Sequence, residues 1–169
     1  FKDIVVENNP TDISFKKPNR MYTSDDWIMP SVEKDGVGPI LVFTDASGSV
    51  NNKEFTQFMS DFLIICEELQ PERVIHIQFD SFATDHEEIE PGDEPEQVRT
   101  KRGGTRFKAP FDYARKHDLL DDAEAILVFT DGGDNTYADE PDCPVIWAST
   151  GAFWRGDPPY GTIINVKFD

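Results

Sequence analysis

The sequence is poor in basic residues and has no long apolar run. Its 16 Lys and Arg residues stand against 33 Asp and Glu, so the formal net charge of the 169-residue chain is −17. Nucleic acids and anionic membrane surfaces are bound through basic faces, so neither class of partner is expected. No apolar stretch approaches the ~20 residues that span a bilayer, and no signal-peptide pattern opens the chain. These absences predict a cytoplasmic protein with no membrane association.

Cysteine is also scarce, with only Cys66 and Cys143 in the chain. Cys66 falls in a helical apolar pattern and Cys143 directly precedes a strand-like run. We therefore expect two free buried thiols rather than a disulfide, in agreement with a reducing compartment. The chain begins at Phe1 rather than Met, which leaves open whether a further domain lies upstream.

Strand and helix patterns alternate over residues 38–169, which we expect to form one domain. The predicted strands are 39–45, 73–80, 85–90, 126–131, 144–149 and 162–168, and the predicted amphipathic helices are 50–69 and 107–117. The short polar segment 85–90 is expected at an edge, antiparallel to its neighbour. This alternation predicts an α/β fold with a doubly wound, mainly parallel sheet flanked by helices.

Residues 1–37 show no sustained period and are rich in Pro, Asn, Asp and Lys. They predict an irregular or extended lead-in. We expect it to pack on the domain through its larger apolar side chains, namely Phe15, Tyr22, Trp27 and Ile28.

The hexapeptide Ile-Leu-Val-Phe-Thr-Asp occurs twice, at 40–45 and at 126–131. Each copy is typical of a buried parallel strand whose final aspartate emerges at the carboxyl edge of the sheet. If the two strands are neighbours with crossovers in opposite directions, Asp45 and Asp131 line the crevice between them.

Two hydroxyls follow the first copy, in Asp45-Ala46-Ser47-Gly48-Ser49. Skipping one residue each time lets the first, third and fifth side chains converge, and Gly48 is expected to permit the tight backbone. Together with Asp131 these oxygens suggest a site for a hard divalent cation. The competing interpretation is that Ser47 and Ser49 only cap the following helix.

Three ordered elements resemble the metal-ion-dependent adhesion site of von Willebrand factor A (VWA) domains. They are Asp45-x-Ser47-x-Ser49, the Gly-Gly-Thr loop ending at Thr105, and Thr130-Asp131-Gly132. A closer resemblance is to the A-like domain at the C-terminus of predicted bacterial metallopeptidases often encoded beside MoxR-type ATPases. It is carried by the segments 14–20, 90–93, 144–151 and 159–161, so it covers nearly the whole chain.

The resemblance implies a Rossmann-like VWA fold and a divalent-metal-dependent protein–protein interaction module. Ser47, Ser49 and Thr105 would coordinate Mg²⁺ or Mn²⁺ directly, while Asp45 and Asp131 would act mainly through bound waters or as switching ligands. An open position on the metal would accept an acidic side chain from a protein partner. The module would be the binding or regulatory part of a metallopeptidase-type protein, with a MoxR-type AAA+ ATPase as a candidate partner.

Basic residues crowd the loop that carries Thr105. They are Arg99, Lys101, Arg102, Arg106 and Lys108. Arg106 is a departure from the family, which commonly has an acidic residue at that position. The group is either a local counterbalance to the acidic surface or a rim that steers an acidic partner.

A catalytic motif is not complete in this chain, so whether it is an enzyme is left open. The string nearest to His-Glu-x-x-His starts at His86 and lacks the second histidine. The enzyme alternative is a metal-dependent hydrolase or phosphoryl-transfer site using Asp45 and Asp131. However, Ser47 stands where a haloacid-dehalogenase-like site needs aspartate, and neither a Gly-x-Ser-x-Gly elbow nor a phosphate loop occurs. A third possibility is a degenerate, metal-free structural domain.

Overall fold

The computed structural model describes residues 37–90, 93, 103–150 and 157–166, together with the backbone at 13–14 and 31–32. In the lead-in, strand β1 (Ile13–Ser14) pairs antiparallel with β2 (Ser31–Val32). The four lead-in side chains predicted to pack on the domain lie outside the described residues.

The centre of the fold is a six-stranded mixed sheet in the order β5-β4-β3-β6-β7-β8. Its strands are β3 (Ile40–Asp45), β4 (Val74–Phe79), β5 (Glu87–Ile89), β6 (Ala125–Thr130), β7 (Val145–Ser149) and β8 (Thr162–Asn165). All neighbouring pairs are parallel except β4 and β5. The predicted α/β class, the mainly parallel sheet and the antiparallel edge strand are therefore confirmed.

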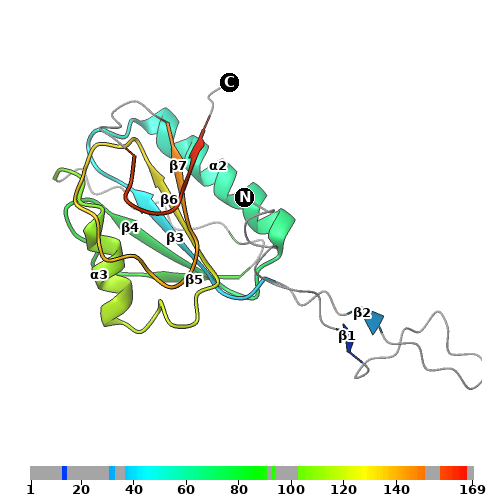
Figure 1. Ribbon diagram of the computed structural model, residues 1–169. Coiled ribbons are helices and arrows are strands. Elements are labelled where there is room, and N and C mark those ends of the chain that lie inside the picture. The colour runs from blue at the N-terminus through cyan, green and yellow to red at the C-terminus, as the bar shows by residue number, and fades with distance from the viewer. Residues whose placement is uncertain are drawn as a thin grey trace, which may run out of the picture.

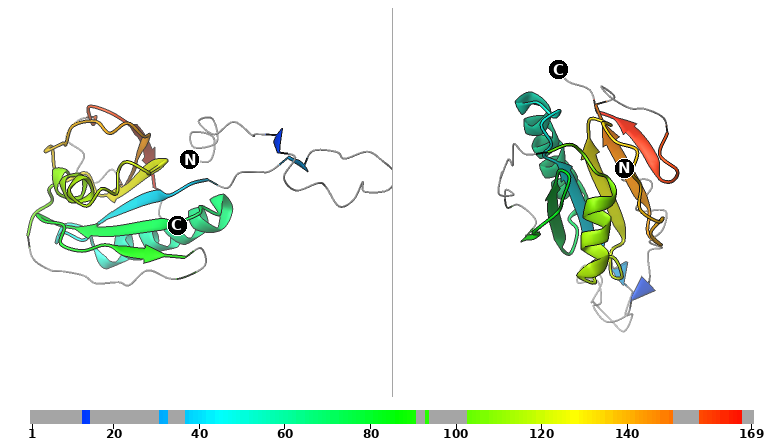
Figure 2. Two further views of the ribbon diagram at one scale, coloured as in Figure 1. Left: turned by 90° about the horizontal axis from the view of Figure 1, so that it is seen from below. Right: turned by 90° about the vertical axis from the view of Figure 1, so that its left-hand side faces the viewer.

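Helix α2 (Asn52–Leu69) covers one face of this sheet and α3 (Lys108–Lys116) the other (Figures 1 and 2). The start of α2 is fixed by a capping box. The Asn51 side chain accepts from the Glu54 amide at 3.0 Å, and the Glu54 carboxylate accepts from the Asn51 amide at 2.8 Å. The helix ends before Gln70, whose backbone is left-handed with φ 46°.

Successive residues of the buried strands point to opposite faces and build two separate cores. On the α2 side, Phe58 and Phe62 are fully buried, and the Phe58 ring lies 5.3 Å from that of Phe129. On the α3 side, Trp147 is fully buried and its indole N–H donates to the carbonyl of Tyr160 at 2.9 Å. Burying each such side chain stabilises the fold by about 1.5–3 kcal/mol. Packing on both faces therefore stabilises the sheet.

The crossovers diverge between β3 and β6, which lie side by side at the centre of the sheet. From β3 the chain passes through α2 to β4 on one side, whereas β6 leads to β7 and β8 on the other. The carboxyl ends of β3 and β6 therefore meet at the position where doubly wound sheets leave a crevice. This is the arrangement that the repeated hexapeptide predicted.

The two cysteines are free, as predicted. Cys66 is buried on α2, but Cys143 is partly exposed, so the expectation that both are buried is wrong for Cys143. Within the described ranges, no helix combines the length and apolar character needed to cross a membrane.

Candidate metal and partner site

Asp45 ends strand β3 and its side chain is completely buried. One carboxylate oxygen accepts the Ser47 amide at 2.9 Å, and the other accepts the Thr130 hydroxyl at 2.8 Å. Both oxygens are thus held in place by neighbours on β6 and on the turn after β3.

The three predicted hydroxyl ligands come together at this edge. The Ser47 and Ser49 hydroxyl oxygens lie 3.0 Å apart, and the Thr105 hydroxyl donates to that of Ser47 at 2.9 Å. Thr105 is 58 residues away from Ser47 in the chain, so the tertiary fold brings these hydroxyls together.

Asp131 follows β6 directly and is completely buried. Its Oδ1 accepts the Gly133 amide at 3.1 Å, whereas its Oδ2 is buried without a hydrogen-bond partner among the described residues. A β-carbon at Gly133 would lie 3.2 Å from Asp131 Oδ1, 3.6 Å from Thr105 Oγ1 and 3.8 Å from Ser49 Oγ. Oxygens from three separate segments therefore approach one point beside Gly133, and the absence of a side chain at position 133 leaves that point free.

Burial controls the electrostatics of Asp45. It raises the pKa of this carboxyl from 3.8 to about 6, against the lowering effect of hydrogen bonds from Ser47 and Thr130. The charge of Asp131 raises the pKa further. Without a cation the site therefore holds two carboxylates under mutual repulsion in a poorly solvated position.

The donor set fits a small, hard divalent cation. Carboxylate and hydroxyl oxygens are the ligands that Mg²⁺ and Mn²⁺ accept, and Asp131 Oδ2, which no described residue donates to, has unused acceptor capacity. No cluster of three or more His, Cys, Asp or Glu side chains suited to a metal occurs in the described part of the chain. A cation here would depend on the three hydroxyls as well as on the two carboxylates.

The site is buried at its base and open at its rim. Asp45, Ser47 and Asp131 are inaccessible, Thr105 is partly exposed and Ser49 is exposed. A ligand would therefore approach past Ser49 and Thr105. Of the predicted basic rim, Arg106, which follows Thr105 directly, and Lys108, the first residue of α3, are exposed. The other three members of the rim (Arg99, Lys101 and Arg102) lie outside the described residues.

Thr130 is a positioning residue that the sequence interpretation missed. Besides donating to Asp45, its hydroxyl accepts the Gly132 amide at 3.1 Å, so it connects β3 to the turn that carries Asp131. Its place in the repeated hexapeptide and in the Thr130-Asp131-Gly132 element was the available signal, but neither pattern assigned its hydroxyl a role.

Asp134 is a second such residue. Its carboxylate accepts the Phe107 amide at 2.8 Å and also accepts from Thr136. Although burial raises the pKa of Asp134, these hydrogen bonds outweigh it and hold the pKa below 3.8. Asp134 thereby ties the loop after β6 to the segment that follows Thr105.

The expected role of Gly48 is wrong. The described glycines with positive φ are Gly103, Gly132 and Gly161, and a β-carbon at position 48 would meet nothing within 4 Å. Ser47 and Ser49 therefore converge without a backbone that only glycine can adopt.

The histidines lie apart from the oxygen cluster. His76 is buried on β4, with its Nε2 3.0 Å from the Thr44 hydroxyl. His86 is exposed, and its Nδ1 lies 3.0 Å from the Tyr113 hydroxyl. The residues that follow His86 form edge strand β5 rather than the helix that a zinc-peptidase motif requires.

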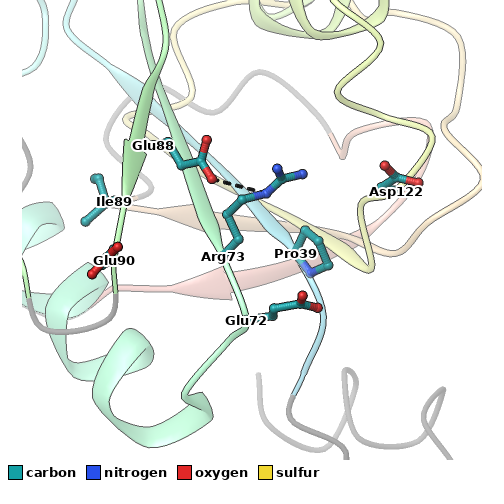
Figure 3. A pocket seen from close by; sticks show the side chains of 7 residues that line it. All are labelled: Pro39, Glu72, Arg73, Glu88, Ile89, Glu90 and Asp122. Atoms are coloured by element: carbon teal, nitrogen blue, oxygen red, sulfur yellow. Dashed lines mark ion pairs between the residues drawn. The ribbon is translucent and has the colours of Figure 1, made fainter.

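A separate cavity of about 510 Å³ lies at the opposite, amino-terminal end of the parallel strands (Figure 3). It is lined mainly by acidic side chains around Arg73, whose Nε lies 3.6 Å from Glu88 Oε1. Since Arg73 precedes β4 and Pro39 precedes β3, this cavity is no part of the cluster at the carboxyl ends.

Comparison with known proteins identifies a family for this chain. A family model described as a VWA-like domain (DUF2201) matches residues 40–167, which include the whole six-stranded sheet and all five predicted site residues. No curated protein sequence matches the chain.

Proposed function

This chain belongs to the family of VWA-like domains (DUF2201), and on that premise we propose that it is a protein-interaction module whose partner binding requires a divalent cation. Ser47, Ser49 and Thr105 would hold Mg²⁺ or Mn²⁺ through their hydroxyls, with Asp45 and Asp131 supplying negative charge mainly through waters. The cation would supply an open position for an acidic side chain of the partner.

The observation that carries this proposal is the space around Gly133, bordered by oxygens of Ser49, Thr105 and Asp131. Two further features support it. Asp131 Oδ2 is buried and finds no hydrogen-bond partner in the described part of the chain, and the accessible side of the cluster is formed by Ser49 and Thr105. Arg106 beside this opening would favour the approach of an acidic group and disfavour a basic one.

We further propose that the module is the binding or regulatory part of a metallopeptidase-type protein, with a MoxR-type AAA+ ATPase as its partner. This extension rests on the sequence resemblance described above. An enzyme acting through Asp45 and Asp131 is the alternative. Activity towards generic phosphatase or esterase substrates with Mg²⁺, lost on Asp131→Asn, would favour that alternative instead.

Gly133→Ala tests the metal site with little change to the fold. The new methyl group would lie 3.2 Å from Asp131 Oδ1, closer than ordinary contact, and would occupy the space between the oxygens. We expect at least a tenfold loss of Mg²⁺ or Mn²⁺ affinity by calorimetry, because each 1.4 kcal/mol of lost interaction is tenfold. The matched control is Gly48→Ala in the adjacent loop, where the methyl group meets nothing within 4 Å.

Retention of metal affinity in Gly133→Ala, or an equal loss in Gly48→Ala, would contradict this assignment. A wild-type chain that takes up neither cation would favour the metal-free structural domain. Ser47→Ala and Thr105→Ala extend the test to partner binding. Each should abolish divalent-dependent capture of the candidate ATPase, while capture that persists in a chelator would remove metal dependence from the proposal.

A further inference from the structure

Phe82 is an exposed aromatic residue at the same edge of the sheet as the candidate site. In the described part of the chain the exposed large apolar side chains are Phe82, at 70% exposure, and Ile64, at 53%. A single exposed apolar residue is common on protein surfaces, so exposure alone assigns no role. The placement of Phe82 is different, because it lies in the loop after β4, at the carboxyl edge where the oxygen cluster is found.

The backbone of this loop is held in a fixed position. The Phe82 amide donates to the Asp80 carboxylate at 2.9 Å, and the Asp80 amide donates to the Phe82 carbonyl at 3.0 Å. The next residue, Ala83, is partly buried against the core on the α3 side. Phe82 is therefore presented outwards from a supported turn, so a ligand would gain apolar contact at little cost in backbone ordering.

The same turn is joined to the segment that carries Thr105. The Ser81 hydroxyl donates to the Gly104 carbonyl at 2.9 Å, and the Arg106 amide donates to the Asp80 carbonyl at 2.9 Å. These two bonds flank Thr105 on both sides in the sequence. The loop that bears Phe82 and the loop that bears Thr105 are thus one connected surface.

This connected surface carries three kinds of group. The hydroxyl oxygens of Ser49 and Thr105 face the candidate cation site, Arg106 provides an exposed positive charge, and Phe82 provides exposed apolar area. A complementary ligand has a carboxylate with an apolar side chain close to it in the chain. A peptide of purely acidic residues would leave Phe82 in water.

We propose that Phe82 is a specificity-determining contact, and that the partner binds through an acidic residue flanked by apolar side chains. This inference rests on the metal-dependent interaction proposed above. It adds the class of peptide that the site selects. Ile64, on α2, belongs to a different surface, because it lies 12 positions along the helix from its start at Asn52, or about 18 Å at 1.5 Å per residue.

The test uses two capped, dye-labelled pentapeptides, each with one central aspartate. In one peptide leucine flanks the aspartate on both sides, and in the other glycine does. Fluorescence anisotropy in Mg²⁺ should show about tenfold tighter binding of the leucine-flanked peptide, as expected for burying part of an aromatic ring. Phe82→Ala should abolish this preference while leaving Mg²⁺ affinity unchanged. Phe82→Leu should retain most of it, and Ile64→Ala should retain all of it.

A preference that survives in Phe82→Ala, or equal binding of both peptides by the wild-type chain, overturns the role of Phe82. In either case Mg²⁺-dependent binding of the aspartate would persist and the proposed function would stand. If neither peptide binds in a Mg²⁺-dependent way, the proposed function and this inference both fail. Mg²⁺ calorimetry on the same samples then shows whether the loss lies in metal binding or in carboxylate recognition.

Discussion

Asp45 places a buried negative charge at the base of the candidate site, and Asp45→Asn measures what that charge does to the fold. The asparagine has nearly the same shape and keeps an oxygen to accept the Ser47 amide. Its amide nitrogen replaces the oxygen that accepts the Thr130 hydroxyl, so that hydrogen bond must reverse or be lost. The substitution therefore removes the charge and disturbs one hydrogen bond.

The magnitude follows from the pKa of Asp45. The pKa is 3.8 in the unfolded chain and about 6 in the folded chain without metal, mainly because of burial. A group whose folded pKa is raised stabilises the fold fully below pH 3.8, and that contribution is lost as pH rises through 6. At 1.36 kcal/mol per unit, ionised Asp45 costs about 3 kcal/mol above pH 6. Subtracting about 1 kcal/mol for the disturbed hydrogen bond leaves a net gain of about 2 kcal/mol for Asp45→Asn.

The assay is urea unfolding in a chelator between pH 4.5 and 8, followed by tryptophan fluorescence. Asp45→Asn should be more stable than wild type near pH 7.5, and the difference should shrink as pH falls. Adding Mg²⁺ should stabilise wild type by about 2.7 kcal/mol at a hundredfold excess over the dissociation constant and should stabilise Asp45→Asn much less. The metal-free wild type is thus expected to be the least stable of the four states.

A less stable Asp45→Asn at pH 7.5 in chelator would refute this reasoning. It would mean that the two hydrogen bonds of the Asp45 carboxylate outweigh its desolvation, and that the buried charge does not destabilise the fold. A difference that does not change with pH would equally rule out the titration of Asp45 as its cause.

Two further predictions concern the hydroxyls and the buried imidazole. Thr130→Val should lower Mg²⁺ affinity about tenfold, because it removes the hydrogen bond that holds Asp45 to β6. Thr44→Val should leave Mg²⁺ affinity unchanged but should lower the free energy of unfolding by about 1–3 kcal/mol, because it leaves the buried His76 Nε2 without the Thr44 hydroxyl. Calorimetry measures the first effect and urea unfolding the second. Burial lowers the pKa of His76 to about 4, and Glu87, 41% exposed and 4.0 Å away, is too well solvated to offset it. The stability that neutral His76 provides above pH 6.5 should fall by about 3 kcal/mol as pH drops through 4, and in an Asp45→Asn background His76→Gln should flatten this dependence.

Much of the fold could be predicted because apolar periodicity is local. The two predicted helices and the central strands begin and end within two residues of the expected positions, and the Asn51–Glu54 capping box forms as predicted. The site was harder to predict because its contacts join distant segments. Thr130 reaches Asp45 across 85 residues and Asp134 reaches Phe107 across 27, and no local pattern marks either pair. Gly48 shows the opposite error, in which a local pattern suggested a constraint that the three-dimensional structure does not impose.

The two identical hexapeptides acquire different roles through a stagger of one residue between their strands. In the ladder Leu41 pairs with Ile126 and Thr44 with Phe129, so each residue of the first copy lies beside the preceding residue of the second.

Because side chains alternate between faces, a one-residue stagger makes equivalent residues of the two copies point to opposite sides of the sheet. Thr44 therefore faces α2 and pairs with His76, while Thr130 faces α3 and donates to Asp45. The same stagger sets Asp131 one residue beyond Asp45, past the end of β6, where the turn at Gly132 and Gly133 brings its Oδ1 towards Thr105 and Ser49. Strands in equal register would have set the two aspartates side by side, with neither threonine placed to bridge the strands. Because of this stagger, the two identical hexapeptides contribute different side chains to the same candidate site.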